Sequence, residues 1–515
     1  MGILAYIFES LEQHKIAVAI CVLLSYPTFN AVYNLYFHPL SKHPGPKLWA
    51  ASRLPFIYCL VTGKLVQRER EFHEKYGDFL RLAPDEVSFA SEEAWNDIYT
   101  FRKGHKRALR DKRYYTAPDS KVDNIITTAD FRFHARIRGI LSNSFTEASL
   151  RSQYPLILSK ADLLISQLQL LAENPANNGE GGRINMTEWL NFFTMDTISD
   201  LAFGESFGCL EKGDYHEWVR TLFSFLKYMS LAAAPRYYPT LEFLLMKLVP
   251  KSVMEGQKKH MQYAFEKINR RIDLKSDRPD FMTPFMRNNV NFESISRDEI
   301  LATFNFVIIG GSETSATALT GIFNHLSKNE NKEILQRLCA DIRTKFTTQQ
   351  EITFDSIQSI PYLEAVISEG LRVCNPVPGG LPRVVPEGGD TYCGIFLPEG
   401  TRLAVRTFAT NRSQKNFNDP DKFAPERWLA EDQRPTDYSK DSLTASRPFS
   451  SGFHSCLGRP LAMLEMRLVI IKLLLAFDIS VDAKDSVNFD DFPVIMLIQK
   501  LPMLLRIKPR SLGKE

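Results

Sequence analysis

The 515-residue chain has few cysteines, and no spacing in the sequence pairs them. There are seven, an odd number, and no two form a C-x-x-C motif. This absence argues against a disulfide scaffold, a zinc site, an iron–sulfur cluster and a covalently attached c-type haem. Free cysteines are usually small buried hydrophobic residues. We assign that role to six of them: Cys21, Cys59, Cys209, Cys339, Cys374 and Cys393.

The chain also has little net charge and no nucleotide-binding fingerprint. Its 63 Lys and Arg residues nearly balance 60 Asp and Glu residues, which leaves a net charge of +3. Nothing therefore supports a nucleic-acid partner bound by phosphate neutralisation. Neither a G-x-G-x-x-G motif nor a P-loop occurs, so flavin or nicotinamide chemistry would have to come from another protein. Hydrophobic residues make up 44% and charged residues 24%, which is typical of a globular protein.

One long apolar run lies near the N-terminus, at residues 16–37. Its length suits a bilayer-spanning helix, although Pro27 interrupts it. Basic residues follow it and no small-residue cleavage site is present. This favours an anchor with the remaining chain in the cytosol over a cleaved signal peptide. A buried helix of the head is the alternative. We predict a membrane anchor at 1–40 and a rigid proline-rich connector at 43–46.

No internal repeat and no shift in composition marks a second domain within 41–515. Length alone suggests about three domains at roughly 150 residues each. Strand-like runs occur at 79–82 and 87–89, whereas helical patterns dominate 185–249. We therefore predict one mainly α head with a minor β-sheet. The apolar segment 222–249 is either core or a second membrane-touching surface.

A central helix is predicted to begin at Ser296, which forms a capping-box pattern with Glu299. The run 300–309 is apolar on nearly every side, so this helix should be buried. Gly310 and Gly311 then interrupt it, although each glycine costs roughly 1 kcal/mol in a helix interior. Close approach of a flat ligand would explain them.

The residues after these glycines are Glu313 and Thr314, an acid–alcohol pair that can relay protons at a reaction centre. The competing interpretation is that the glycines end one helix and Ser312 caps the next. The residues by themselves favour this second interpretation.

A second motif is Glu369 with Arg372, on a helix that Pro361 should open. On a solvated surface such a pair contributes only about 0.2–0.5 kcal/mol. If it is buried, removing one partner costs about 3–5 kcal/mol. A third motif, at 425–428, brings Arg427, which can share the Glu369 carboxylate.

The fourth motif is the glycine-containing segment 449–458 around Cys456. A helical pattern starts just after Cys456 and runs to Phe477. A helix N-terminus lowers the pKa of a thiol and favours the thiolate. Gly452 and Gly458 let the backbone turn and approach a planar partner. A lone cysteine near glycines is more often structural, so this motif alone does not define a function.

These four motifs, in this order and spacing, resemble the cytochrome P-450 family of haem-thiolate monooxygenases. The resemblance covers nearly the whole chain, and residues 189–210 are similar to fungal members. It implies that Cys456 is the axial ligand of haem b, donating electron density that favours O–O cleavage. It also implies that Gly310 and Gly311 accommodate the porphyrin and that Glu313 and Thr314 supply protons.

The resemblance further implies cationic contacts to the haem propionates, which need compensating charge. The candidates by family position are His134, Arg138, Arg383 and His454. The chain departs from the family at two of them. His454 stands where the family usually has Arg, and His134 where it often has Trp. Since histidine titrates near neutral pH, we hypothesise that His454 makes haem retention pH-sensitive.

The implied function is a membrane-anchored monooxygenase that hydroxylates, epoxidises or otherwise oxidises a hydrophobic terpenoid, polyketide or alkaloid intermediate. Electrons would come from NADPH through a separate reductase, with cytochrome b5 as a further donor. The chain would sit in the endoplasmic reticulum membrane as a single-pass protein with a cytosolic head. A haem-thiolate isomerase or dehydratase that does not use dioxygen, and a non-catalytic haem-binding protein, are the alternatives. The presence of both Glu313 and Thr314 argues against them.

By the same analogy the substrate pocket would draw on mostly apolar segments, which favours a hydrophobic substrate. The segments are the loop at 105–125, the stretch 222–249, Phe304, Val307, residues 377–381 and the chain near Pro493.

Overall fold

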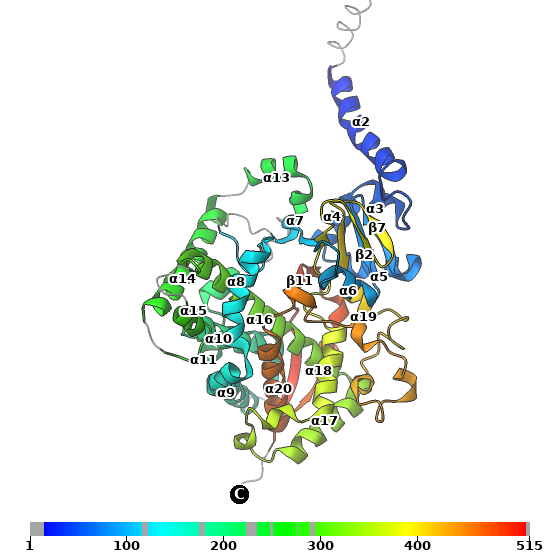
Figure 1. Cartoon of the computed structure of the whole chain (residues 1–515). Coiled ribbons are helices and arrows are strands. Elements are labelled where there is room, and N and C mark those ends of the chain that lie inside the picture. The colour runs from blue at the N-terminus through cyan, green and yellow to red at the C-terminus, as the bar shows by residue number, and fades with distance from the viewer. Residues whose placement is uncertain are drawn as a thin grey trace, which may run out of the picture.

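A computed structural model of the chain describes residues 15–115, 122–174, 181–222, 234–247, 251–274, 277–288 and 294–510. Helices make up most of the head, and the main sheet lies to one side of it, below helix α2 (Figure 1). The predicted mainly α architecture with a minor sheet is confirmed. Parts of the predicted segments 105–125 and 222–249 fall outside the described residues.

The core of the head is a set of long packed helices. They are α9 (Glu147–Ala172), α10 (Met186–Phe203), α16 (Arg297–Ser327), α18 (Pro361–Val373) and α20 (Arg459–Ala476). α10 and α16 pack along each other, and α16 runs through the centre of the head (Figure 1). Nearly every residue of α10 is buried, because the helix is covered on all sides.

Further helices surround this core. They are α3 (Lys47–Ala51), α4 (Leu54–Val61), α5 (Leu65–Tyr76), α6 (Glu93–Tyr99), α7 (Lys112–Tyr115), α8 (Phe131–Leu141), α11 (Cys209–Lys212), α13 (Pro239–Met246), α14 (Lys251–Asp273), α15 (Met282–Asn288), α17 (Lys332–Lys345) and α19 (Thr407–Asn411).

The main sheet has the strand order β1-β2-β8-β5-β3. Its strands are β1 (Phe79–Ala83), β2 (Glu86–Phe89), β3 (Leu109–Arg110), β5 (Arg383–Val384) and β8 (Arg402–Val405). The strands predicted at 79–82 and 87–89 are therefore confirmed as β1 and β2. β2 pairs in parallel with β8, with Glu86 opposite Arg402, so this sheet joins two parts of the chain that are far apart in sequence.

Three smaller sheets complete the fold. One has the order β4-β12-β9, from β4 (Gly182–Asn185), β12 (Leu504–Pro509) and β9 (Phe477–Ser480). Two are two-stranded: β6 (Asp390–Tyr392) with β7 (Ile395–Leu397), and β10 (Val494–Ile495) with β11 (Leu497–Ile498).

A buried ion network holds the N-terminal helices against the main sheet. The Glu86 carboxylate accepts a hydrogen bond from Arg53 at 2.6 Å, lies 3.1 Å from Arg402 and also bonds to Arg406. Burial alone would raise the pKa of Glu86, but these arginines lower it to about 2.

Glu369 and Arg372 are fully buried, so the alternative that they form a solvated surface pair is wrong. Arg372 donates two hydrogen bonds to Glu369, at 2.7 and 2.8 Å, and Arg427 donates a third at 3.1 Å. Trp428 Nε1 and the Ala424 N–H also donate to this carboxylate, each at 2.8 Å. The arginines outweigh burial and lower the pKa of Glu369. The motif at 425–428 thus supports the pair, as predicted.

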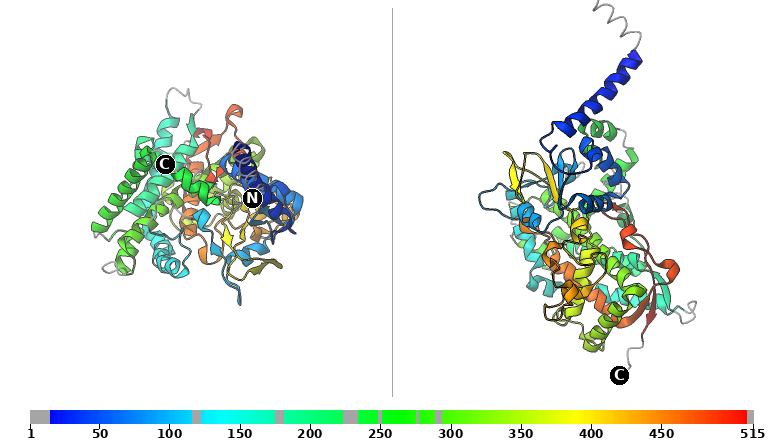
Figure 2. Two further views of the ribbon diagram at one scale, coloured as in Figure 1. Left: turned by 90° about the horizontal axis from the view of Figure 1, so that it is seen from above. Right: turned by 90° about the vertical axis from the view of Figure 1, so that its right-hand side faces the viewer.

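Helix α2 (Lys15–Tyr36) extends away from the head (Figures 1 and 2). Several of its described aromatic side chains are exposed, including Tyr26, Phe29 and Tyr36. Residues 1–14 of the predicted anchor lie outside the described residues. The connector at 43–46 is held against β1, where the Arg81 N–H donates to Pro44 O at 2.6 Å.

Among the described residues, two helices are long and apolar enough to cross a membrane, α9 and α16. Both belong to the core of the head, and the apolar part of α16 is mostly buried there. Their packing against α10, α18 and α20, and not their length and composition, identifies these two as core helices.

Candidate active site

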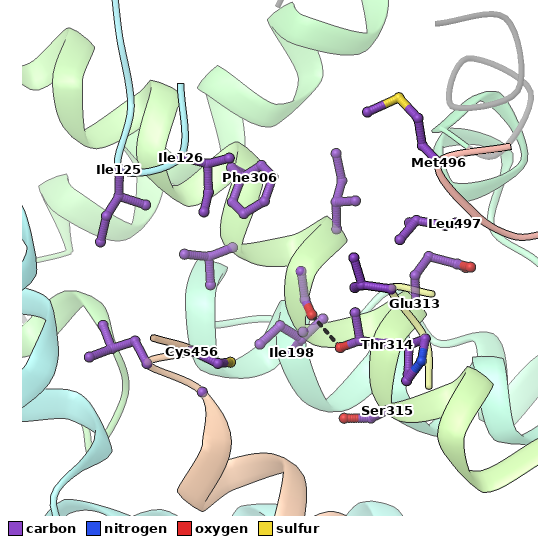
Figure 3. Close-up of a pocket in the computed structure, with 18 of the residues that line it drawn as sticks. Ile125, Ile126, Ile198, Phe306, Glu313, Thr314, Ser315, Cys456, Met496 and Leu497 are labelled. Carbon is purple, nitrogen blue, oxygen red and sulfur yellow. Dashed lines mark hydrogen bonds between the residues drawn. The ribbon is translucent and has the colours of Figure 1, made fainter. Parts of the chain in front are cut away.

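A cavity of about 1360 Å³ lies between α16 and the segment that precedes α20. Figure 3 shows Cys456 on one side of it and Thr314 of α16 on the other. Most small-molecule pockets have volumes of roughly 300–1,000 Å³. This cavity therefore has room for a cofactor together with a substrate.

Cys456 lies three residues before α20, and its side chain is open to the cavity. The loop is held by a hydrogen bond from the Cys456 N–H to Phe449 O at 2.8 Å. Gly452 has φ +70, and a Cβ there would lie 2.0 Å from Tyr99 O. Gly452 is thus required by the turn and by the close approach of the chain at Tyr99.

Backbone N–H groups of Gly458 and Arg459 act on the Cys456 sulfur as predicted and lower its pKa. Desolvation is larger, however, so the pKa of the thiol is raised overall. The N–H groups at the start of α20 therefore act in the predicted direction, but their effect on the pKa is smaller than that of desolvation. A thiolate at this position needs a further positive charge, and a bound metal ion would supply it.

Helix α16 is continuous from Arg297 to Ser327, so the glycines do not end one helix and begin another. Its capping box is formed as predicted: Ser296 Oγ accepts from the Glu299 N–H, and the Glu299 carboxylate accepts from the Ser296 N–H. Ser312 does not cap a helix; its hydroxyl donates to Ile308 O at 2.7 Å.

The two glycines of α16 differ in what they accommodate. A Cβ at Gly310 would have ordinary contacts, the nearest being Phe306 at 3.4 Å. A Cβ at Gly311 would lie 2.5 Å from Ile198 Cδ1 on α10. Both residues line the cavity, but the structural reason for Gly311 is helix packing, whereas we had attributed both glycines to a flat ligand.

The acid–alcohol pair lies at the cavity. Thr314 Oγ1 donates to Gly310 O at 2.7 Å (Figure 3). The Glu313 carboxylate forms an ion pair with Lys500, whose Nζ lies 2.5 Å from Glu313 Oε2. Lys500 follows β11, and its position in the sequence contains no signal of this contact.

Three of the four predicted propionate contacts line the cavity together. His134 and Arg138 lie on α8, and both line the cavity together with His454. The His134 and His454 rings are 4.5 Å apart, and Arg138 donates to Ser455 O at 2.8 Å. Arg383, on β5, is buried behind them and is not one of the lining residues.

Arg110 joins this cluster and was missed by the sequence analysis. It lies on β3, directly opposite Arg383 on β5, and lines the cavity. A strand of two residues leaves no periodic signal, so the pairing could be found only from the fold.

The electrostatics of this cluster fit an anionic group. Burial, and after it the neighbouring arginines, lower the pKa of His134 to about 3. The pKa of His454 is also strongly lowered, by burial first and then by Arg383, Arg110, His134 and Arg138. His134 Nδ1, Arg110 Nε and Arg383 Nη1 are buried without a hydrogen-bond partner among the described residues. Two carboxylates, such as haem propionates, would satisfy these donors.

The apolar part of the cavity agrees only partly with the predicted substrate segments. Val307, Val377 and Leu381 line it, and so does the chain near Pro493, at residues 495–500. Phe304 does not; it is fully buried against Phe285, with ring centroids 5.3 Å apart. Phe306 lines the cavity instead (Figure 3).

Comparison with known proteins agrees with this geometry. A family model described as Cytochrome P450 matches residues 43–506. The cytochrome P450 monooxygenase lcsI of Purpureocillium lilacinum is 37% identical over 511 residues, covering 98% of this chain and 96% of the relative. Averantin hydroxylase of Dothistroma septosporum is 35% identical (96% and 91% covered). Versicolorin B desaturase of Aspergillus parasiticus is 36% identical (96% and 97% covered).

This family binds haem through a cysteine thiolate, takes electrons from a redox partner and oxidises hydrophobic substrates. The match extends over the four motifs and over both sides of the cavity. The chain belongs to the cytochrome P450 family and is a monooxygenase.

Proposed function

We propose that the chain is a membrane-anchored haem-thiolate monooxygenase that oxidises a hydrophobic intermediate of fungal secondary metabolism. One observation carries this proposal: Cys456 and the Glu313–Thr314 pair face each other across one large cavity. The cavity has an anion-binding end, formed by the His134–Arg138 side of α8 and by His454. These are the parts that a haem and a substrate above it require.

Cys456 would hold the haem iron, and Arg138, Arg110, Arg383, His134 and His454 would hold the two propionates. When bound there, haem would supply the dioxygen activation and oxygen-atom transfer of the reaction. Gly310 lies on the face of α16 that borders the space for the porphyrin, and as a glycine it places no Cβ in that space. The buried Glu369–Arg372–Arg427 cluster lies outside the cavity lining and acts on stability.

Glu313 and Thr314 would deliver the protons that the reaction consumes. The Thr314 hydroxyl is fixed by its bond to Gly310 O, and this orientation keeps its oxygen at the cavity as an acceptor. Glu313, one residue earlier, is placed to pass a proton on through water. The presence of both Glu313 and Thr314 supports a monooxygenase that uses dioxygen. It argues against an isomerase, a dehydratase and a haem-binding protein without turnover.

The substrate would lie above the haem among apolar side chains, including Ile125, Ile126, Phe306 and Leu497 (Figure 3). A few polar groups interrupt this surface, such as Asn191, whose Nδ2 donates to Tyr215 OH at 2.8 Å. Such a lining suits a terpenoid, polyketide or alkaloid. The names of two relatives, a hydroxylase and a desaturase, support a role in this kind of metabolism.

We place residues 1–40 in the endoplasmic reticulum membrane as a single span and residues 41–515 in the cytosol as the catalytic head. The direction of α2 and its exposed aromatic residues support this arrangement (Figure 1). NADPH would act only through a reductase, with cytochrome b5 as a further donor.

Two experiments test the proposal. A carbon monoxide difference spectrum of the reduced protein should show the thiolate-type band; a folded sample without it contradicts haem-thiolate binding. Deleting the gene in its host should lead to accumulation of one hydrophobic compound. The purified protein with a reductase should convert that compound with consumption of NADPH and dioxygen, whereas an isomerase or dehydratase would convert it without NADPH.

A further inference from the structure

The ion pair between Lys500 and Glu313 connects the segment after β11 to the centre of α16. Lys500 Nζ donates to Glu313 Oε2 at 2.5 Å and to Thr317 Oγ1 at 3.3 Å. Only 5% of the Lys500 side chain and 12% of the Glu313 side chain are exposed. Lys500 is therefore a largely buried counter-ion of the carboxylate to which we assign proton delivery.

A buried carboxylate needs this compensation, because an unpaired charge is strongly disfavoured away from water. The contact also fixes where the carboxylate points. Thr317 Oγ1 donates to Glu313 O at 2.7 Å, so the ammonium group bonds to two residues one turn apart on α16. Removing the Lys500 ammonium group would leave the Glu313 carboxylate without its counter-charge and without the contact that fixes its orientation.

The same segment of chain forms one wall of the cavity. Residues 495–499 line it immediately before Lys500. Met496, at the tip between β10 and β11, has φ +61, which is unusual for a residue other than glycine. The hairpin is anchored at Val494, whose N–H donates to Gly63 O at 3.0 Å. A substrate that contacts this tip therefore acts on the backbone that carries Lys500.

We propose that Lys500 is a positioning residue for Glu313 and that it links occupation of the β10–β11 tip to proton delivery. The inference rests on the proposed function, in which Glu313 relays protons. Lys500 also lines the cavity; the role proposed for it is exerted through the Glu313 carboxylate.

The first test measures the pair without turnover. Thermal unfolding of the haem-loaded protein is compared for wild type, Lys500→Met, Glu313→Gln and the double variant. Each single variant should lower Tm, and the double variant should lower it by less than the sum, since the lost interaction is shared. Additive losses would overturn the proposed pairing. Lys508→Met, an exposed lysine on β12, is the matched control and should leave Tm unchanged.

The second test measures coupling, with the compound that accumulates in the deletion strain as substrate. Lys500→Met should lower product formed per NADPH by about tenfold, part of the 10²–10⁴-fold typical of acid–base catalysis, with KM within about twofold of wild type. Lys500→Arg should recover most of the loss because it restores the charge. The thiolate-type spectral band should be the same in all variants.

The outcomes separate the inference from the function on which it rests. If Glu313→Gln lowers coupling and Lys500→Met does not, Lys500 has no positioning role and the proton role of Glu313 stands. If neither variant changes coupling, the proton role assigned to Glu313 is wrong, and the role of Lys500 falls with it.

Discussion

Gly311 of α16 lies directly against Ile198 of α10, where a Cβ at position 311 would be 2.5 Å from Ile198 Cδ1. Gly310, one residue earlier, has no such neighbour: the nearest atom to a Cβ there is Phe306 Cε1 at 3.4 Å. Two adjacent glycines at the same cavity thus face different constraints.

We predict that Gly311→Ala destabilises the protein by about 1–3 kcal/mol, the range for an overpacked core. In the haem-free protein, Gly310→Ala should be neutral or stabilising by up to about 1 kcal/mol, since alanine favours the helix. Thermal unfolding checks both. The double variant Gly311→Ala with Ile198→Ala should recover part of the loss; no recovery, or equal stability of the two single variants, contradicts the packing explanation.

Replacing Cys456 with serine should abolish the thiolate-type band and the activity, because a neutral hydroxyl does not replace a thiolate ligand. The carbon monoxide difference spectrum of the reduced protein is the measurement. Cys339→Ser, a change at a buried cysteine of α17, should keep the band. A normal band in Cys456→Ser would remove the proposed ligand.

Replacing Glu369 with glutamine should destabilise the head by about 3–5 kcal/mol, because Arg372 would lose its buried counter-ion and Arg427 would keep only Asp441. Glu364→Gln, on the same helix, breaks a partly exposed pair with Arg467 and should cost no more than about 1 kcal/mol. Yield of folded protein and Tm report both. Similar losses in the two variants would show that burial of the Glu369 cluster is not what matters.

Replacing Thr314 with alanine should leave haem binding intact but increase hydrogen peroxide formed per NADPH and lower product formation. Thr320→Ala is the control. It removes an equivalent hydroxyl, bonded to Ala316 O at 2.8 Å on the same helix but away from the cavity. If both variants form the same increased amount of hydrogen peroxide per NADPH, the effect comes from a change in the helix and not from loss of a hydroxyl at the reaction centre.

Glu465 of α20 predicts a pH-dependent change in stability. Burial raises its pKa from 4.5 to about 8, and the nearby Ser315 opposes this only in part. At a pH between these two pKa values, Glu465 is protonated in the folded protein and ionised in the unfolded chain. Ionisation thus favours the unfolded chain, and the free energy of unfolding falls as the pH rises through this range. Glu465→Gln, which cannot ionise, should therefore gain Tm over wild type between pH 5.5 and pH 8.5.

The control for this titration is Glu431→Gln, a change at an exposed carboxylate. Its Tm relative to wild type should stay constant over the same range. A constant difference for Glu465→Gln as well would mean that this carboxyl is ionised in the folded protein.

The features that sequence reasoning located are those whose signal is local. The capping box of Ser296 and Glu299 and the opening of α18 at Pro361 each lie within one helical turn, and both are confirmed. In β1 and β2, apolar and polar residues alternate over a few positions, and the sequence predicted both strands. Local patterns suffice where the interaction is between near neighbours.

The features that were missed depend on contacts between distant parts of the chain. Lys500 and Glu313 are 187 residues apart, and Arg110 meets Arg383 across a two-residue strand pair. The reason for Gly311 is a side chain on another helix. The raised pKa of Cys456 reflects desolvation, which depends on the complete fold. No window along the sequence contains this information.

The parallel pairing of β2 with β8 has a consequence for how the protein is made. Glu86 and Arg402 are partners in this pairing and in the buried ion network. At roughly 5–20 residues per second of synthesis, β2 waits about 15–60 s before β8 leaves the ribosome. During that time β2 has an unpaired edge, and Glu86 lacks two of its three arginines. The edge of β2 that β8 covers is therefore open to other contacts until residues 402–405 have emerged.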